Sequence, residues 1–113
     1  MEHFRDGCGN VVGVLRGEGK GPNVMLNGHM DVVPAGSMEA WAPYKPFDPV
    51  VEDGKLYGRG TSDMLAGLSA TFFAFREIKK AVDRGAKLSG DLIFSAVVME
   101  EPAESVGAIY LMK

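Results

Sequence analysis

Short apolar runs alternate with polar, glycine-rich stretches in the first half of the chain, a pattern typical of strands joined by turns. Residues 11–15 (VVGVL) and 24–26 (VML) predict two strands, and the glycine-rich segment 17–23 between them predicts a turn. We therefore expect these two strands to pair with each other. Further along, residues 50–57 (VVEDGKLY) predict a hairpin, because Asp-Gly is a favoured two-residue hairpin turn.

The clearest predicted helix extends from Met64 to about Arg84. Residues 61–63 (TSD) are all of the types favoured at a helix N-cap, and Gly85 is suited to end the helix. Six apolar residues recur every three or four positions and would form one apolar face: Leu65, Leu68, Phe72, Phe75, Ile78 and Val82.

The segment 92–99 (LIFSAVVM) is almost entirely apolar and lies between Asp91 and Glu100. It predicts a central strand that is buried on both faces. A last helix is expected after Pro102. Strands that alternate with helices around such a buried strand indicate an α/β fold.

Residues 34–49 hold four of the six prolines and predict an extended surface loop. Three aromatic residues lie in this loop, namely Trp41, Tyr44 and Phe47. They would either cover a neighbouring site or pack on the core, and we favour packing on the core.

The composition narrows the class of protein. The chain has 113 residues, of which 46% are hydrophobic and 24% are charged. This composition is typical of a globular domain. No apolar run reaches the roughly 18 residues of a membrane span, so we expect no membrane partner. A net charge of −3 gives no global attraction to nucleic acid, so no nucleic-acid partner is expected either. The single cysteine, Cys8, excludes an intrachain disulfide.

Three polar clusters lie at the ends of the predicted elements. His29 and Asp31 follow the second strand, Asp63 precedes the long helix, and Glu100 and Glu101 follow the central strand. Ligands of open α/β sheets bind outside the carboxyl ends of strands, so a histidine and several carboxylates there suggest a divalent metal site. One glutamate would bind the metal while its neighbour acts as a general base.

Each cluster taken alone also has a purely structural interpretation. His29 would cap a turn that Asp31 begins, and Asp63 would cap the helix. The glutamate pair would lie at the N-terminus of the last helix, where negative charge is favourable. Isolated short motifs specify chemistry loosely, so the individual clusters leave both interpretations open.

Taken together, the clusters resemble one family. Their order, spacing and flanking residues are similar to those of the co-catalytic zinc peptidases, the family of acetylornithine deacetylase, succinyl-diaminopimelate desuccinylase, aminoacylase and carboxypeptidase G. The similarity extends from about Gly9 to Lys113. The segments that carry it are 27–34 (NGHMDVVP), Trp41, 46–47 (PF), 53–64 (DGKLYGRGTSDM) and 100–101 (EE).

The resemblance implies a three-layer αβα fold with a mixed, partly parallel sheet and a site for two zinc ions, with cobalt or manganese as possible replacements. By the family pattern His29 would bind one zinc and Glu101 the other, and Asp63 would bridge both. Asp31 would orient His29, and Glu100 would be the general base and acid. The peptide bond after Asp63 is often cis in this family.

The reaction implied by the resemblance is hydrolysis of an amide bond in a small molecule, either an N-acyl amino acid or a short peptide. A metal-bridging water activated by Glu100 would attack the carbonyl. The full-length parent is expected to be a cytoplasmic homodimer.

Two features depart from the family pattern. Leu65 stands where many relatives have lysine. Family members are also several hundred residues long, with a dimerisation domain and further metal ligands, so we interpret residues 1–113 as part of a catalytic domain. The alternative is a catalytically inactive fragment or pseudo-enzyme of the same fold that acts at most as a weak metal-binding or interaction module.

Overall fold

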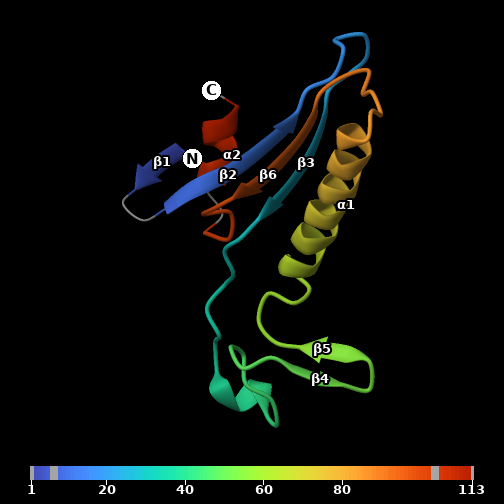
Figure 1. Ribbon diagram of the computed structural model, residues 1–113. Helices are drawn as coiled ribbons and strands as arrows, with labels where there is room; N and C mark the ends of the chain where they lie inside the picture. Colours follow the sequence, from blue (N-terminus) through green and yellow to red (C-terminus); the bar gives the residue numbers. More distant parts are fainter. Residues whose placement is uncertain (1, 6–7, 103–104, 113) are drawn as a thin grey trace.

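A computed structural model describes residues 2–5, 8–102 and 105–112. Its strands and helices follow one another along a chain that begins and ends near the main sheet (Figure 1). In chain order they are β1 (Glu2–Arg5), β2 (Cys8–Leu15), β3 (Val24–His29), the 3₁₀ helix η1 (Met38–Trp41), β4 (Val50–Glu52), β5 (Lys55–Tyr57), α1 (Leu65–Asp83), β6 (Leu92–Val97) and α2 (Val106–Leu111).

The main sheet has the strand order β1-β2-β6-β3. Strand β6 runs antiparallel to β2 and parallel to β3, with Val24 opposite Leu92 and His29 opposite Val97. The predicted central strand and the mixed, partly parallel sheet are therefore confirmed. The expected pairing of residues 11–15 with 24–26 is wrong, because β6 lies between these two strands.

The position of β6 follows from its composition. Five of its six residues are buried, and only Ile93 is partly exposed. By contrast, Val24 and Met25 of β3 are each 51% exposed, as suits a strand at the edge of the sheet. Placing β6 between β2 and β3 buries the most apolar strand on both sides, which is the more favourable arrangement.

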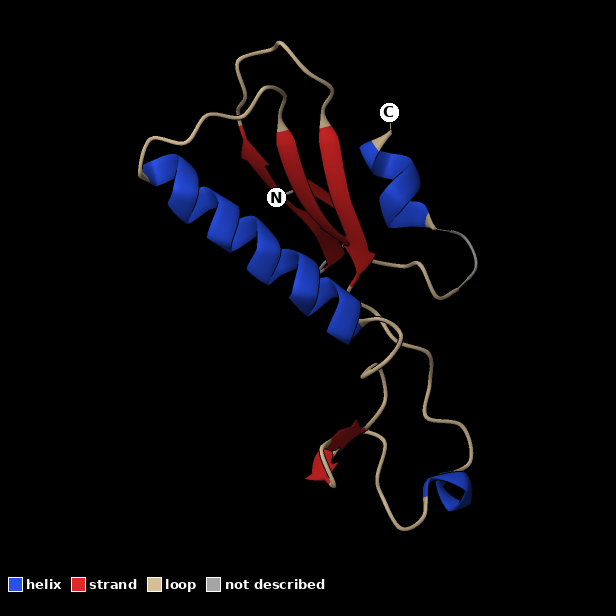
Figure 2. Cartoon of the chain, turned by 90° about the vertical axis from the view of Figure 1, so that its right-hand side faces the viewer, coloured by secondary structure: helices blue, strands red, loops and turns tan. Residues whose placement is uncertain are grey.

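The sheet lies between two helices, so the fold has the three layers that the family resemblance implies. Helix α1 covers one face and the short α2 lies on the other (Figure 2). Phe72 and Phe75 of α1 pack their rings against Phe94 of β6, with centroids 5.7 and 5.8 Å apart. Phe94 joins Leu92, Ala96 and Val97 in the buried core.

The start of α1 lies close to the end of β3. A Cβ atom at Gly28 would lie 3.0 Å from the Met64 side chain and 3.1 Å from that of Leu68, so glycine allows this approach. The helix N-cap is Met64, without a side-chain hydrogen bond, so the expected capping by residues 61–63 is wrong. The peptide bond from Asp63 to Met64 is cis, as the resemblance implies.

Residues 34–60 form a segment that extends away from the sheet (Figure 1). The predicted hairpin is confirmed as β4 and β5, with Asp53 and Gly54 at positive φ in its turn. The expectation that the loop aromatics pack on the core is wrong. Trp41 contacts Arg59, and Tyr44 stacks on Tyr57 with ring centroids 4.3 Å apart.

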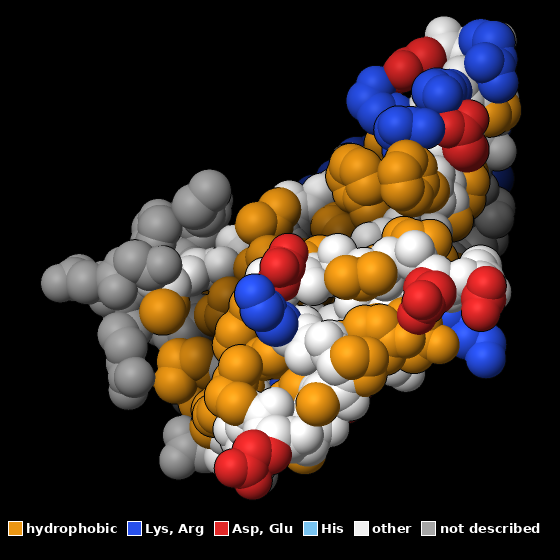
Figure 3. Space-filling view, turned by 90° about the horizontal axis from the view of Figure 1, so that it is seen from below, with side chains coloured by type: hydrophobic (Ala, Val, Ile, Leu, Met, Phe, Trp, Pro, Cys, Tyr) orange, Lys and Arg blue, Asp and Glu red, His pale blue; other side chains and the backbone are white. Residues whose placement is uncertain are grey.

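The aromatic residues pack locally because this segment does not reach the core of the sheet. Large apolar side chains remain exposed in it, including those of Phe47, Val51 and Leu56. Seen from below, apolar side chains are spread widely over the surface of the molecule (Figure 3). Among the helices that the structure describes, none combines the length and the apolar character that crossing a membrane requires.

Candidate metal centre

The candidate site is built around His29, the last residue of β3. Its side chain is 6% exposed, and Nδ1 lies 2.9 Å from the backbone carbonyl oxygen of Asp31. With Nδ1–H donating to that carbonyl, Nε2 is left as the acceptor that faces the neighbouring acids. The strand end therefore fixes both the orientation and the tautomer of this imidazole.

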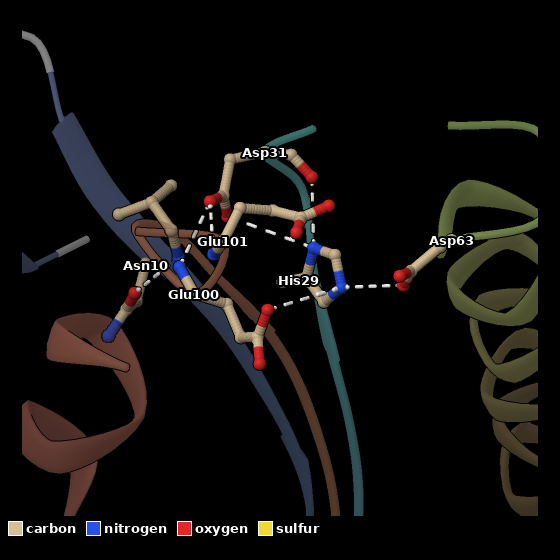
Figure 4. A network of polar contacts seen from close by, with 7 residues as sticks. Asn10, His29, Asp31, Asp63, Glu100 and Glu101 are labelled. Atoms are coloured by element: carbon tan, nitrogen blue, oxygen red, sulfur yellow. Dashed lines mark hydrogen bonds and ion pairs between the residues drawn. The ribbon is translucent and has the colours of Figure 1, made fainter. Parts of the chain in front are cut away.

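Three carboxylates lie around the imidazole of His29 (Figure 4). Nε2 lies 3.1 Å from Oδ1 of Asp63 and 3.7 Å from Oε2 of Glu100. Ligand atoms of His29, Asp63 and Glu101 all lie within 4.8 Å of one another. The structure thus brings together side chains from the end of β3, the loop before α1 and the turn after β6.

The surrounding groups change the acidity of the imidazole. Burial alone would lower the pKa of His29. The Asp31 carbonyl hydrogen bond and the carboxylates of Asp63, Glu100 and Asp31 outweigh burial and raise that pKa above its ordinary value.

Asp31 holds the glutamate pair through the backbone. Its Oδ2 accepts the N–H groups of Glu100 and Glu101, each at 3.0 Å. Met99, the residue before the pair, has φ 59°, which turns the chain after β6 so that two successive N–H groups face one oxygen. Asn10 supports this turn, because its Oδ1 accepts the Val98 N–H at 3.2 Å.

The contact between Asp31 and His29 differs in detail from the one that the family resemblance suggests. The imidazole is oriented by the backbone carbonyl of Asp31, while the nearer carboxylate oxygen lies 3.9 Å from Nδ1. The link from Asp31 to the glutamate pair had no signal in the sequence, because it joins residues 69 and 70 positions apart.

The donor set is suited to a divalent cation. One imidazole nitrogen and carboxylate oxygens are ligands that zinc accepts, and cobalt or manganese accept them as well. Several carboxylates held close together repel each other unless a cation or proton lies between them. Oδ1 of Asp31 is also buried without a hydrogen-bond partner among the described residues, which leaves negative charge directed into the cluster.

A cavity of about 690 Å³ adjoins the cluster. Asp31 and Glu101 form its polar side, and the rest of its lining is mainly apolar, including Met30, Val32 and Val98. A smaller hollow of about 190 Å³ is shared by Asp63 and Glu101. The carboxylates are therefore reachable from outside and lie beside a surface that can accommodate an apolar group.

Comparison with known proteins yields relatives over most of the chain. It is 39% identical to N-formyl-4-amino-5-aminomethyl-2-methylpyrimidine deformylase of Bacillus subtilis over 98 residues, 85% of this chain and 22% of that protein. It is 45% identical to succinyl-diaminopimelate desuccinylase of Leptothrix cholodnii over 78 residues, 67% of this chain and 20% of that protein. The chain thus spans about a fifth of the length of these relatives.

A family model covers the candidate site itself. The model for peptidase family M20/M25/M40 matches residues 25–113, which include all of the clustered histidine and carboxylate residues. The match extends over β3, α1 and β6, the elements that position the cluster. The chain therefore belongs to peptidase family M20/M25/M40.

Proposed function

We propose that this chain supplies the metal site of an amide hydrolase that removes an acyl group from a small-molecule amine. The observation that carries the proposal is the convergence of His29, Asp63 and Glu101, with ligand atoms within 4.8 Å of one another. The names of the relatives, a deformylase and a desuccinylase, support N-formyl or N-succinyl compounds as the substrate class. N-acetyl amino acids and short peptides are related substrates.

The three converging side chains would take part in holding the two metal ions that the family resemblance implies, and zinc is the metal that we propose. When bound, a divalent cation here would polarise the amide carbonyl and make water more acidic. His29 is suited to bind because its Nδ1–H is already committed to the Asp31 carbonyl. The exposed carboxylate of Asp63 and the carboxylate of Glu101, in the turn after β6, would be the other ligands that this chain supplies.

Glu100 is the residue that we propose for proton transfer. Its side chain is 44% exposed, and its Oε2 lies 3.7 Å from His29 Nε2, so it is beside the cluster and accessible to water. A carboxylate in this position would take a proton from the attacking water and return it to the leaving amine. Asp31 would keep Glu100 in place through the backbone N–H that it accepts.

The activity is proposed for a protein of the length of the relatives, since this chain spans about a fifth of them. Residues 1–113 would form part of its catalytic domain. From the family resemblance we further propose a cytoplasmic homodimer. The remaining metal ligands would come from segments outside this sequence, so we expect this chain alone to bind zinc weakly and to hydrolyse no N-acyl substrate at an enzyme-like rate.

Calorimetric titration of this chain with zinc chloride tests the metal site. Glu101→Gln should reduce binding, whereas Glu77→Gln, an exposed carboxylate on α1, should leave it unchanged. Equal binding by all three proteins would remove Glu101 from the site.

The substrate class is tested by assaying a full-length protein that contains this sequence against N-formyl, N-succinyl and N-acetyl amines. The deformylase of Bacillus subtilis serves as a positive control for the assay. Hydrolysis of one class would support the proposal. Zinc binding without hydrolysis of any of them would favour the inactive, metal-binding alternative.

A further inference from the structure

Arg59 lies between β5 and α1 and makes contacts that the proposed chemistry does not use. Its guanidinium carbon lies 4.9 Å from the centre of the Trp41 ring, a cation–π geometry. Its Nη2 donates a hydrogen bond to the carbonyl oxygen of Ala35 at 3.3 Å. Trp41 Nε1 donates to the same oxygen at 2.8 Å. The side chains of Trp41 and Arg59 therefore meet at one carbonyl group, that of Ala35.

These contacts connect two loops that carry site residues. Ala35 lies four residues after Asp31, and Arg59 lies four residues before Asp63. The backbone N–H of Arg59 also donates to the carbonyl oxygen of Pro46 at 2.7 Å. Arg59 thus joins the segment that leaves β3 to the segment that enters α1.

Asp63 depends on such a connection more than the other members of the cluster. Its side chain is 78% exposed, and within residues 8–102 its polar contact is with Nε2 of His29, at 3.1 Å. Side-chain packing therefore does little to hold the carboxylate in place. Its position must be set mainly by the backbone of the loop that begins at Arg59.

The residue after Arg59 shows that this loop is closely packed. Gly60 has φ 79°, and a Cβ atom there would lie 2.5 Å from Cγ1 of Val32. The Leu65 N–H donates to the Gly60 carbonyl at 2.9 Å, which connects the loop to the start of α1. The same loop therefore contacts the segment after His29 and fixes where the helix begins.

The side chain of Arg59 is part of this packing and is not a free surface cation. Its Nε is buried and has no hydrogen-bond partner in the part of the chain that the structure describes. The planar guanidinium stacks on Trp41 and reaches Ala35 at the same time. Lysine lacks the planar guanidinium and carries all of its N–H donors on one nitrogen, so it cannot lie flat on Trp41 and reach Ala35 in the same way.

We propose that Arg59 is a positioning residue that holds Asp63 opposite His29 by joining the Asp63 loop to Ala35 and Trp41. The effect on metal binding rests on the proposed function, in which Asp63 is a metal ligand. The connection that Arg59 makes between the two loops does not depend on the proposed function. The connection and its effect on metal binding can therefore be tested separately.

Zinc titration of a full-length protein that contains this sequence is the first test, with Arg59→Ala and Arg59→Lys as variants. Arg76→Ala is the matched control, because Arg76 lies 4.7 Å from the Phe73 ring on α1 in the same kind of contact. We expect both Arg59 variants to weaken zinc binding by about 10–100-fold, the usual effect of removing a group that orients a ligand. The Arg76 variant should bind as the unaltered chain does. Full recovery of affinity with lysine would overturn the proposal, since charge alone would then suffice.

A double-mutant cycle separates positioning of Asp63 from general damage to the fold. If Arg59 acts through Asp63, Arg59→Ala should cause no further loss of zinc affinity once Asp63→Asn is present. An equal loss in both backgrounds would overturn the proposal.

Amide hydrogen exchange tests the connection without a metal. In the zinc-free chain, Arg59→Ala should speed exchange in residues 61–64, while Arg76→Ala should not. Unchanged exchange would overturn the proposal whether or not zinc binds. If a full-length protein that contains this sequence binds no zinc but Arg59→Ala still speeds this exchange, the proposed metal site fails and the inference about Arg59 stands.

Discussion

The carboxylate of Asp31 accepts the backbone N–H of Glu101 at 3.0 Å and so joins two residues that lie 70 positions apart in the chain. The same oxygen accepts the N–H of Glu100 at the same distance. One side chain at the end of β3 thus fixes the backbone that carries both glutamates of the cluster.

We predict that Asp31→Ala and Asp31→Asn have different effects. The amide oxygen of asparagine can still accept the two N–H groups, whereas alanine leaves both without this partner. We expect Asp31→Ala to lower the free energy of unfolding by about 1–3 kcal/mol and to speed amide exchange at Glu100 and Glu101. Hydrogen exchange and chemical denaturation measure both effects. Equal losses in the two variants would show that the charge of Asp31 matters more than these hydrogen bonds.

We predict that Glu100→Gln in a full-length protein lowers kcat by at least about 10²–10⁴-fold, because an amide cannot take the proton of the attacking water. Metal content, measured by atomic absorption, should stay unchanged. Glu101→Gln provides the comparison, since it should lower metal content together with activity. Near-normal turnover by a fully zinc-loaded Glu100→Gln protein would remove Glu100 from this role.

We predict that Gly60→Ala is more destabilising than Gly54→Ala. Both glycines have positive φ, which costs an alanine about 1–2 kcal/mol. Only Gly60 also faces a close neighbour, Val32 Cγ1, and the overpacking adds about 1–3 kcal/mol. Thermal unfolding followed by circular dichroism compares the two variants. A Tm for Gly60→Ala at or above that of Gly54→Ala would contradict the packing described for this loop.

We predict an alkaline titration step that belongs to Tyr44. Its hydroxyl donates to the Glu52 carboxylate, and this bond, with burial and the adjacent negative charge, raises the pKa of Tyr44 to about 12. The neutral form is favoured in the folded state. The stability it contributes is therefore fully present below the unfolded pKa of about 10 and is lost as the pH rises through about 12.

Absorbance of tyrosinate during an alkaline titration measures this step. Tyr44→Phe should remove it, and Glu52→Gln should move it to lower pH. An unchanged titration curve for Tyr44→Phe would assign the step to another group.

The sequence predicted those parts of the fold that depend on local pattern. The apolar run 92–99 located β6, and the Asp53-Gly54 turn located the hairpin. The pairing of β2 with β3 was wrong because the preference of β6 for the centre of the sheet outweighs the short connection between its neighbours. This preference depends on how much of β6 is buried in the folded sheet. The fact that β2 and β3 are neighbours in the sequence does not reveal it.

In the candidate site, too, some features could be predicted from the sequence and others could not. The placement of His29, Asp63 and the glutamate pair at the ends of predicted elements suggests a metal site, and the family resemblance assigns Glu101 as the ligand of that pair. The structure brings His29, Asp63 and Glu101 together. The capping of α1 by residues 61–63 was wrong, because Asp63 faces His29 and Met64 occupies the N-cap. The contact of Arg59 with Ala35 could not be predicted, since no pattern of spacing links an arginine to a backbone carbonyl 24 residues away.

The parallel pairing of β3 with β6 bears on the kinetics of folding. The Asn27 and Ser95 side chains hydrogen-bond to each other across these strands from positions 68 residues apart, so a long loop must close before the strands meet. Contacts of such long range form slowly, and His29 and Glu101 reach the same place only after they have formed. A cation held by both residues would bind only once this pairing has formed, and so would stabilise the folded state more than the transition state. It would therefore slow the rate of unfolding while leaving the rate of folding almost unchanged.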